Sequence, residues 1–343
     1  MEISLTQLKR FRGRCQINFS FVAMAESGTD IDKAKALLLA GELVAIPTET
    51  VYGLAGNALN LASVTKIFEV KGRPQFDPLI VHVPDFDAVG HYATNIPEEA
   101  KLLAQHFWPG ALTLVLSKKN IIPDLVTSGL DSVGLRCPHH PMTNKLLRSL
   151  PFPLAAPSAN PFGYVSPTRP EHVEDQLGNK IAYILDGGPC SIGVESTILG
   201  FEKSKPIVYR LGGITQEQIE SVIGKVSART YSSSNPKSAG QLQSHYAPRK
   251  KLILGDIHEL MKKHSSHSYG ILSFTENFHL RSQVILSSQG QLSEAAQNLF
   301  SALRQLDKMP IDIILAEPVP DVGLGKAIND RLRRASSVEV LNV

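Results

Sequence analysis

The sequence predicts an α/β protein with two units, a larger N-terminal one built on a mixed sheet and a smaller C-terminal one. From about residue 29, short apolar runs alternate with helical patterns, but not in the regular strand–helix order of a parallel sheet. Residues 225–250 are rich in serine and interrupt this pattern, which is typical of a linker. We therefore expect ordered units over residues 25–224 and 251–343.

The first half of the larger unit is predicted from helix signals and from the apolar strands between them. Thr29, with Asp32 three residues later, forms a capping-box-like start, and Gly41 ends that helix. A second helix ends at Gly72, and a third has Pro97 at its first position. The strands expected around these helices are 43–46, 79–83 and 112–116.

The remaining elements follow from the same signals. Thr215 and Gln218 have the spacing of a capping box and start a helix near the end of the larger unit. In the smaller unit, apolar residues at helical spacing predict a helix over 292–306, and a basic helix follows near 327–334. The further strands expected are 133–136, 154–156, 182–185, 197–199, 207–209, 252–254, 269–274 and 311–316.

The net charge of +3 is confined to the start of the chain. Residues 1–24 hold four basic side chains against Glu2, so residues 25–343 sum to zero. A neutral body argues against strong electrostatic binding of nucleic acid. The basic start is typical of an organellar targeting segment or of a disordered extension, with Met24 as an alternative first residue, and we favour the extension.

Composition argues against several classes of protein. No apolar run is long enough to span a membrane or to form a secretory signal. The three cysteines lie far apart and form no CxxC pair, which argues against disulfides and zinc and fits a reducing, cytoplasmic compartment. His139 and His140 are adjacent and so cannot aim both rings at one ion, and we predict no protein-bound metal site.

Polar segments at the ends of predicted elements indicate an anion-binding cleft. Lys71 and Arg73 place two cations on a turn, and the planar fork of arginine can bind phosphate or carboxylate. Arg136 follows a buried strand, and small residues in 155–160 let a ligand approach the backbone. Each segment alone has a structural alternative, such as cations that complement a helix dipole or a hydrogen-bonded structural histidine at His82.

Familiar catalytic and nucleotide-binding motifs are absent. The chain has no GxxxxGK[ST] loop, and the Gly323–Gly325 segment lacks the third small residue of a dinucleotide-binding loop. Ser158 lies in no GxSxG elbow and has no ordered acid–base partners, so we reject a hydrolase triad. The residues alone therefore predict an α/β protein with an anion-binding cleft and nothing more specific.

A series of segments in fixed order resembles the YrdC-like family. They are PTETVYGL, KGRP, PLIVHV, FWPGALTLVL, VGLRCPHHP, APSANPFGYVSPT, GVESTI and YRLGG, over roughly residues 30–224. The later SHYAPRKK and GLGKAINDRLRRAS segments are similar to the longer, two-domain threonylcarbamoyl-AMP synthases. The resemblance implies a YrdC-like domain with a positively charged central cavity, a linker at 225–250 that folds over it as a lid, and a Rossmann-like α/β domain at the C-terminus.

The resemblance also implies a reaction and its partners. L-threonine, bicarbonate and ATP would give threonylcarbamoyl-AMP and pyrophosphate, with Mg²⁺ accompanying the ATP. A separate tRNA threonylcarbamoyl transferase would then modify the adenosine beside the tRNA anticodon. Direct binding of tRNA by this chain is expected to be weak or absent.

Site residues follow from the resemblance by motif position. Lys71 and Arg73 would act in catalysis, and Arg136 would bind the threonine carboxylate. The residues expected to bind ATP or the adenylate are Lys71, Arg73, Asp77, Ser132, Ser158, Asn160, Ser166, Arg210 and Tyr246. Those expected to bind threonine are Thr50, His82, Arg136 and Ser196.

Three alternatives stay open at this point. An RNA-binding module would share the YrdC-like domain, although the zero net charge of residues 25–343 counts against it. The carbamoyl-transfer domain of hydrogenase maturation proteins would share the cavity, but those proteins carry zinc-finger regions and this chain has no CxxC motif. The C-terminal domain could also have a purely structural role.

Overall fold

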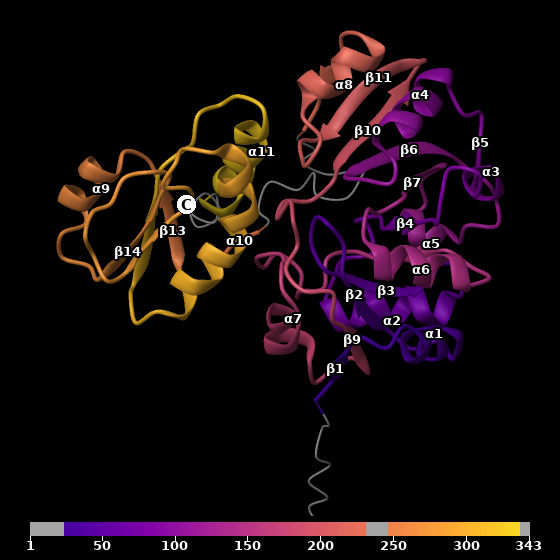
Figure 1. Cartoon of the computed structure of the whole chain (residues 1–343), viewed down its shortest axis with the longest axis horizontal. Coiled ribbons are helices and arrows are strands. Elements are labelled where there is room, and N and C mark those ends of the chain that lie inside the picture. The colour runs from indigo at the N-terminus through magenta and orange to yellow at the C-terminus, as the bar shows by residue number, and fades with distance from the viewer. Residues whose placement is uncertain (1–23, 231–245, 337–343) are drawn as a thin grey trace, which may run out of the picture.

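A computed structural model describes residues 24–230 and 246–336 (Figure 1). They form a larger unit on a twelve-stranded mixed sheet and a smaller unit on a four-stranded parallel sheet. The predicted fold class, a mixed-sheet α/β domain followed by a smaller α/β domain, is confirmed. The predicted extension at 1–24 lies outside the described residues except for Met24. Residues 231–245 of the predicted linker also lie outside them.

The larger sheet has the order β1-β9-β2-β3-β8-β4-β7-β6-β10-β11-β12, with β5 paired to β6. Parallel pairs such as β4 with β7 alternate with antiparallel pairs such as β6 with β7. Its strands are β1 (Glu26–Gly28), β2 (Val44–Ile46), β3 (Gly53–Asn57), β4 (Ile80–His82), β5 (Ala93–Thr94), β6 (Leu112–Lys118), β7 (Ser132–Arg136), β8 (Leu154–Ala155), β9 (Tyr183–Leu185), β10 (Thr197–Glu202), β11 (Lys205–Arg210) and β12 (Ser227–Ala228). The last of these lies within the predicted linker.

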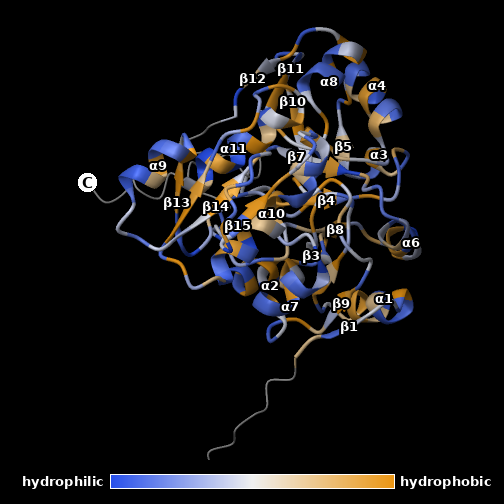
Figure 2. Ribbon diagram, turned by 60° about the vertical axis from the view of Figure 1, so that its left-hand side comes forward, coloured by the Kyte–Doolittle hydropathy of each residue, from blue (hydrophilic) through white to orange (hydrophobic). Residues whose placement is uncertain are grey.

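Helices flank this sheet and present their apolar sides to it, as the hydropathy colours show (Figure 2). They are α1 (Ile31–Leu39), α2 (Leu61–Lys71), α3 (Val89–Tyr92), α4 (Glu98–Phe107), α5 (Asp124–Thr127), α6 (Pro141–Ser149), α7 (Pro170–Leu177) and α8 (Gln216–Ile223). None of the helices in the described ranges combines the length and hydrophobicity needed to cross a bilayer.

The smaller unit packs two long helices against the larger one (Figure 1). Its sheet has the order β13-β16-β14-β15. The elements are β13 (Lys251–Leu254), α9 (Ile257–Lys263), β14 (Tyr269–Ser273), β15 (Gln283–Ile285), α10 (Leu292–Lys308), β16 (Ile313–Ala316) and α11 (Leu324–Ser336). One apolar core joins the two units, because Val51, Val165 and Val194 of the larger unit pack in the same cluster as Leu299 and Phe300 of α10.

Several predicted helix ends are confirmed and two are wrong by one residue. Gly72 caps α2 in the left-handed region at φ 60°, and Thr215 with Gln218 forms the expected capping box. The cap of α1 is Asp30 rather than Thr29, because the Asp30 carboxylate accepts from the Lys33 amide. Pro97 is the N-cap of α4 rather than its first helical residue, since its ψ of 154° is still extended.

The sequence signals missed some elements, of which β3, α6 and α7 matter most for the site. Strand β3 has the sequence GLAGN, which lacks the β-branched and aromatic residues that favour strands. It forms a strand because it lies between β2 and β8, where both neighbours satisfy its backbone groups. Helices α6 and α7 each begin with proline at the first position, a signal the prediction did not use.

Candidate functional site

A small polar cavity, with a volume of about 50 Å³, lies at one edge of the larger sheet, where several strands begin or end. The strands β4, β7 and β11 end at this edge, and β10 begins there, so residues far apart in the sequence converge. Eight of the residues expected to bind substrates line it, namely Thr50, Arg73, His82, Arg136, Ser158, Ser196, Arg210 and Tyr246. The cavity therefore brings together residues from both the expected ATP set and the expected threonine set.

Arg73 is held rigidly on one wall of the cavity. The left-handed turn at Gly72 ends α2 and directs the chain back, as the sequence predicted. The Arg73 guanidinium donates to the carbonyl oxygens of Asp77 and Pro78 and pairs with the Asp77 carboxylate at 2.8 Å. Asp77 does not line the cavity itself. Its contact is with Arg73, so in this structure it positions the arginine.

Lys71 lies behind the cavity wall rather than on it. Its ammonium donates to the carbonyl oxygens of Ser158 and Asn160 and so ties the end of α2 to the loop after β8. Burial, with the nearby Arg73 cation, lowers the pKa of Lys71. The Asn160 amide nitrogen donates to two carbonyl oxygens, while its buried Oδ1 has no hydrogen-bond partner in the described part of the chain. Lys71 therefore fixes the backbone that carries Ser158 into the cavity.

Arg136 is paired with a carboxylate that the predicted set of site residues did not include. Its Nη2 donates to Glu49 Oε1 at 2.7 Å, and its Nε donates to the Gly110 carbonyl oxygen at 3.2 Å. The other Glu49 oxygen accepts from the His139 amide at 3.0 Å. Glu49 adjoins the predicted Thr50, and a carboxylate between two threonines just after a buried strand was the available signal. Both members of this pair are nearly fully buried.

A second buried network surrounds Arg210. The Arg210 guanidinium donates to the Ser196 hydroxyl and to the Ser196 carbonyl, each at 3.0 Å, and that hydroxyl also contacts Thr113 at 2.7 Å. Next to Ser196, the Glu195 carboxylate lines the cavity and accepts from the Ser166 hydroxyl at 2.6 Å. Ser166 does not line the cavity itself, and Glu195 is a further residue that sequence reasoning missed.

His82, at the end of β4, and Thr50, in the turn after β2, both line the cavity. The Thr50 hydroxyl lies 2.8 Å from that of Thr48, which also accepts from the amides of Thr50 and Val51 and so shapes the turn. His82 is buried at the end of β4, and its Nδ1 has no hydrogen-bond partner in the described ranges. Burial and the Arg136 cation lower the pKa of His82 to about 3, so the ring is neutral and can exchange hydrogen bonds with a bound molecule.

The depressed pKa of His82 predicts a stability loss in acid. The unfolded chain takes up the proton near pH 6.5 and the folded chain only near pH 3, so stability is complete above pH 6.5 and falls as the pH decreases between these values. We expect His82→Gln to flatten the plot of unfolding free energy against pH by up to about 1.4 kcal/mol per pH unit in this window. Urea titrations at pH 7, 5 and 4 measure this.

The exposed His106 on α4 provides the matched control for this pH series. His106→Gln should leave the slope of stability against pH as it is in the unmodified protein. Identical slopes for His82→Gln and the unmodified protein would contradict a neutral His82 in the folded state.

Tyr246 belongs to the predicted linker but is fully packed. It lines the cavity, its ring stacks on Phe300 of α10 at 5.8 Å between ring centroids, and the Arg331 guanidinium lies 4.7 Å from its ring centre. The expectation that the linker reaches the cavity therefore holds for this residue. The lid itself falls largely on residues 231–245, which lie outside the described part of the chain.

Five of the predicted residues do not line the cavity, namely Lys71, Asp77, Ser132, Asn160 and Ser166, and Ser132 lies at the far end of a strand that leads to it. Ser132 begins β7 while Arg136 ends it, which separates the two by roughly 13 Å at 3.3 Å per residue. Ser132 lines another pocket, together with Asp131, Glu202 and Tyr209. The five-residue strand β7 thus has one predicted residue, Arg136, at the end beside the cavity and the other, Ser132, at its opposite end.

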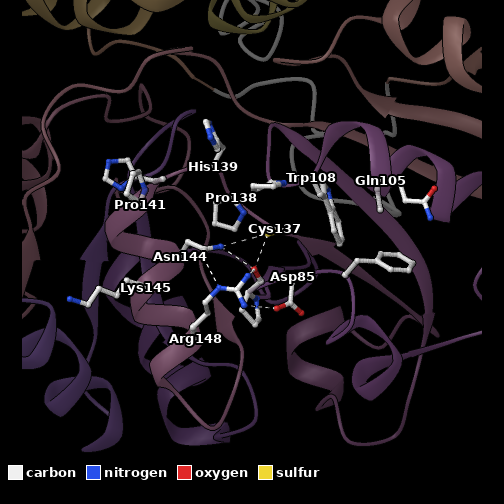
Figure 3. Close-up of a pocket in the computed structure, with 15 residues that line it drawn as sticks. Asp85, Gln105, Trp108, Cys137, Pro138, His139, Pro141, Asn144, Lys145 and Arg148 are labelled. Carbon is white, nitrogen blue, oxygen red and sulfur yellow. Dashed lines mark hydrogen bonds and ion pairs between the residues drawn. The ribbon is translucent and has the colours of Figure 1, made fainter.

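A larger and more open pocket is lined by Cys137, Pro138 and His139, which directly follow Arg136 in the chain (Figure 3). Its walls carry Trp108 and Phe86 on one side and α6 on the other, where Arg148 pairs with Asp85 at 2.8 Å. Glu49 links the two spaces, because it binds Arg136 on one side and the amide of His139 on the other. This pocket contains none of the residues predicted to bind substrates.

The polar cavity is suited to multiply charged anions. Three arginines line it, and each is partly held by carbonyl or hydroxyl groups, so the cations are fixed before a ligand arrives. Their carboxylate neighbours Asp77, Glu49 and Glu195 are engaged with arginines. Within the described ranges, no group of three or more His, Cys, Asp or Glu side chains is arranged to hold a metal ion.

Comparison with known proteins decides the family. A family model described as telomere recombination matches residues 36–212, and one described as the C-terminal domain of threonylcarbamoyl-AMP synthase matches residues 214–337. The chain is 42% identical to threonylcarbamoyl-AMP synthase of Bacillus subtilis, with 93% of this chain and 96% of that protein covered. The chain belongs to the threonylcarbamoyl-AMP synthase family. As a member of this family, it is an enzyme of the nucleotidyltransferase type.

Other members of the synthase family agree over nearly the whole chain. The synthase of Pyrococcus abyssi is 41% identical, with 90% of this chain and 95% of that protein covered. A solved structure of P. abyssi Sua5 complexed with L-threonine superposes with a TM-score of 0.85 at 40% identity, covering 92% of this chain and 97% of that chain. Both units of this synthase family member, and not only the YrdC-like one, therefore have counterparts in the family.

Proposed function

We propose that this enzyme forms threonylcarbamoyl-AMP and pyrophosphate from L-threonine, bicarbonate and ATP, for the modification of the adenosine beside the tRNA anticodon. The observation that carries the proposal is that Arg73, Arg136 and Arg210, all buried, line one and the same cavity. The relative from P. abyssi, whose solved structure contains L-threonine, supports threonine as the amino-acid substrate.

The chemistry explains why three cations are useful in one cavity. The threonine nitrogen forms a carbamate with bicarbonate and releases water. A carbamate oxygen then attacks the α-phosphorus of ATP, and the bond from that phosphorus to the pyrophosphate oxygen breaks. Nucleophile and electrophile are both negatively charged, so their approach requires fixed positive charge and the exclusion of water.

We propose a division of roles that follows the walls of the cavity. Arg73 and Arg210 bind the phosphates, and Ser158 contacts the nucleotide through the loop that Lys71 holds. Arg136 binds the threonine carboxylate, with Glu49 setting its orientation. Thr50, His82 and Ser196 contact the remaining polar groups of threonine. In this proposal Lys71 acts through backbone positioning, and Asp77 acts through Arg73.

Magnesium enters this proposal only as the companion of ATP. The carboxylates around the cavity are committed to arginines, and no metal-binding cluster is found in the described residues. An ion held mainly by phosphate oxygens and water fits this donor set, because Mg²⁺ commonly keeps several waters and needs few protein ligands. Magnesium would neutralise part of the triphosphate charge.

We further propose that a separate transferase receives the product. The zero net charge of residues 25–343 favours weak or no direct binding of tRNA. The match of residues 214–337 to the C-terminal domain of the synthase favours this function over the carbamoyl-transfer domain of hydrogenase maturation proteins.

Pyrophosphate release tests the proposal. We expect release from ATP only when threonine and bicarbonate are both present, because the carbamate must form before the α-phosphorus is attacked. Labelled threonine should appear in a product that co-migrates with threonylcarbamoyl-AMP on chromatography. Controls omit one substrate at a time. Equal pyrophosphate release without threonine would identify a general ATP-hydrolysing activity instead.

A further inference from the structure

One side chain of the smaller unit reaches the wall of the cavity. Arg331 of α11 is completely buried, with 0% of its surface exposed. Its Nε donates to Glu195 Oε2 at 2.8 Å, its Nη1 to Asp330 Oδ2 at 2.6 Å, and its Nη2 to the Leu211 carbonyl oxygen at 2.8 Å. All three guanidinium nitrogens are therefore engaged, and two of them hold the larger unit.

The partners of Arg331 are parts of one half of the cavity. Glu195 lines the cavity and, through its other oxygen, holds the Ser166 hydroxyl. Leu211 directly follows Arg210 in the chain, and the Tyr246 ring lies under the Arg331 guanidinium. Ser166, Arg210 and Tyr246 all belong to the set of residues expected to bind the nucleotide. The described hydrogen bonds of Arg331 reach none of the threonine residues Thr50, His82, Arg136 and Ser196, although Ser196 directly follows Glu195 and accepts from Arg210.

Close packing of the smaller unit against the larger one fixes the position of Arg331 relative to the cavity. Gly193, with φ 81°, lies so close to α10 that an added Cβ would be 2.4 Å from the Gln297 Cα. Arg304 of α10 donates to the carbonyl oxygens of Val165 and Ser166, next to the same serine. Burial alone would raise the pKa of Glu195, but Arg331 and Arg210 together lower it, so the carboxylate that links them is charged.

We propose that Arg331 is the positioning residue through which the C-terminal domain sets the nucleotide half of the cavity. It fixes Glu195, and thereby Ser166, and it supports the Tyr246 ring and the backbone beside Arg210. The assignment of this half to ATP rests on the proposed function. Under this proposal the C-terminal domain is part of the binding site and not only a structural appendage.

Separate titrations of ATP and of L-threonine test the proposal on the full-length protein. We expect Arg331→Met to weaken ATP binding by about 10-fold or more, an effect within the usual range for coupled buried residues, and to change threonine binding by less than about 2-fold. Arg331→Lys keeps the charge but loses the fork that bridges three acceptors, so it should weaken ATP binding by a smaller factor. Isothermal titration calorimetry measures both affinities without requiring turnover.

Lys326→Met is the matched control. Lys326 lies on the same helix and also crosses to the larger unit, where it pairs with the exposed Glu217, but it does not reach the cavity. Its loss should leave both affinities unchanged. Three outcomes would each overturn the proposal. Arg331→Lys could weaken the binding of ATP and of threonine equally, or Lys326→Met could weaken both in the same way. Alternatively, both Arg331→Lys and Arg331→Met could leave the affinity for ATP unchanged.

These outcomes differ from a failure of the proposed function. If the unmodified protein binds ATP but makes no threonylcarbamoyl-AMP, the proposed reaction is wrong, and the comparison of ATP affinities still decides the role of Arg331. If the unmodified protein binds no ATP, both proposals fall.

Discussion

Arg73→Ala is expected to reduce turnover by roughly 30- to 1000-fold, corresponding to the loss of about 2–4 kcal/mol of transition-state stabilisation. The reason is the fixed position of its guanidinium. Two carbonyl oxygens and the Asp77 carboxylate hold Arg73 at the cavity wall, so it meets phosphate charge without reorganisation. Steady-state rates with saturating ATP, threonine and bicarbonate measure the effect.

The same substitution has a structural cost that must be separated from catalysis. It removes the ion-pair partner of an Asp77 side chain with 0% exposure, and breaking such a buried pair costs on the order of 3–5 kcal/mol of stability. Activity should therefore be compared at a temperature where circular dichroism shows a folded protein. Lys66→Met, at a half-exposed position on α2, the helix that ends just before Arg73, serves as the control. A folded Arg73→Ala protein with the rate of the unmodified enzyme would remove Arg73 from the phosphate site.

Arg136→Ala is expected to raise the KM for threonine by about 100-fold and to change the KM for ATP by less than a few-fold. A bidentate arginine–carboxylate contact in a buried site typically contributes a few kcal/mol, and Arg136 lies on the side of the cavity that carries His82. The register of the sheet places these two residues directly opposite each other on β7 and β4. Initial rates over a threonine series at fixed ATP, and the reverse, separate the two constants.

Glu49→Gln is the companion variant for this test. It keeps the size of the side chain, but its single amide oxygen can replace only one of the two carboxylate oxygens that accept from Arg136 and from the His139 amide, and it removes the charge that orients the arginine. We expect a smaller increase in the threonine KM, of roughly 3- to 10-fold. If Arg136→Ala lowers ATP affinity as much as threonine affinity, Arg136 belongs to the nucleotide half of the cavity.

Local signals predicted those parts of the fold that depend on a few consecutive residues. The capping box of Thr215 and Gln218 and the left-handed turn at Gly72 are each made by atoms within five positions of one another, so the sequence contains all that they need. The strand β3 was missed because its small residues carry no strand preference of their own. It is a strand only because two neighbouring strands pair with it.

The site divides in the same way. The order of the motifs brought Arg73, Arg136, Ser158 and Arg210 into one set, and the sheet brings them to one cavity. Ser132 is close to Arg136 in the sequence but does not share the cavity with it, because the two residues lie at opposite ends of β7. Lys71 was expected on the ligand side, but its reach to two carbonyl oxygens depends on a loop 87 residues further along the chain.

By itself, the sequence determined the α/β class, most strands and helix ends, the family resemblance and the types of residue that serve an anionic reaction. Only the tertiary structure decided which charges face the cavity and which face each other. The clearest case is α11, which the sequence predicts only as a basic helix near 327–334. Its Arg331 and Arg334 are buried, because Asp330 lies beside them and Glu195, 136 positions earlier, is brought to Arg331 by docking of the two units. A charged side chain can be buried only where opposite charge and hydrogen-bond acceptors surround it, and those partners come from distant parts of the chain.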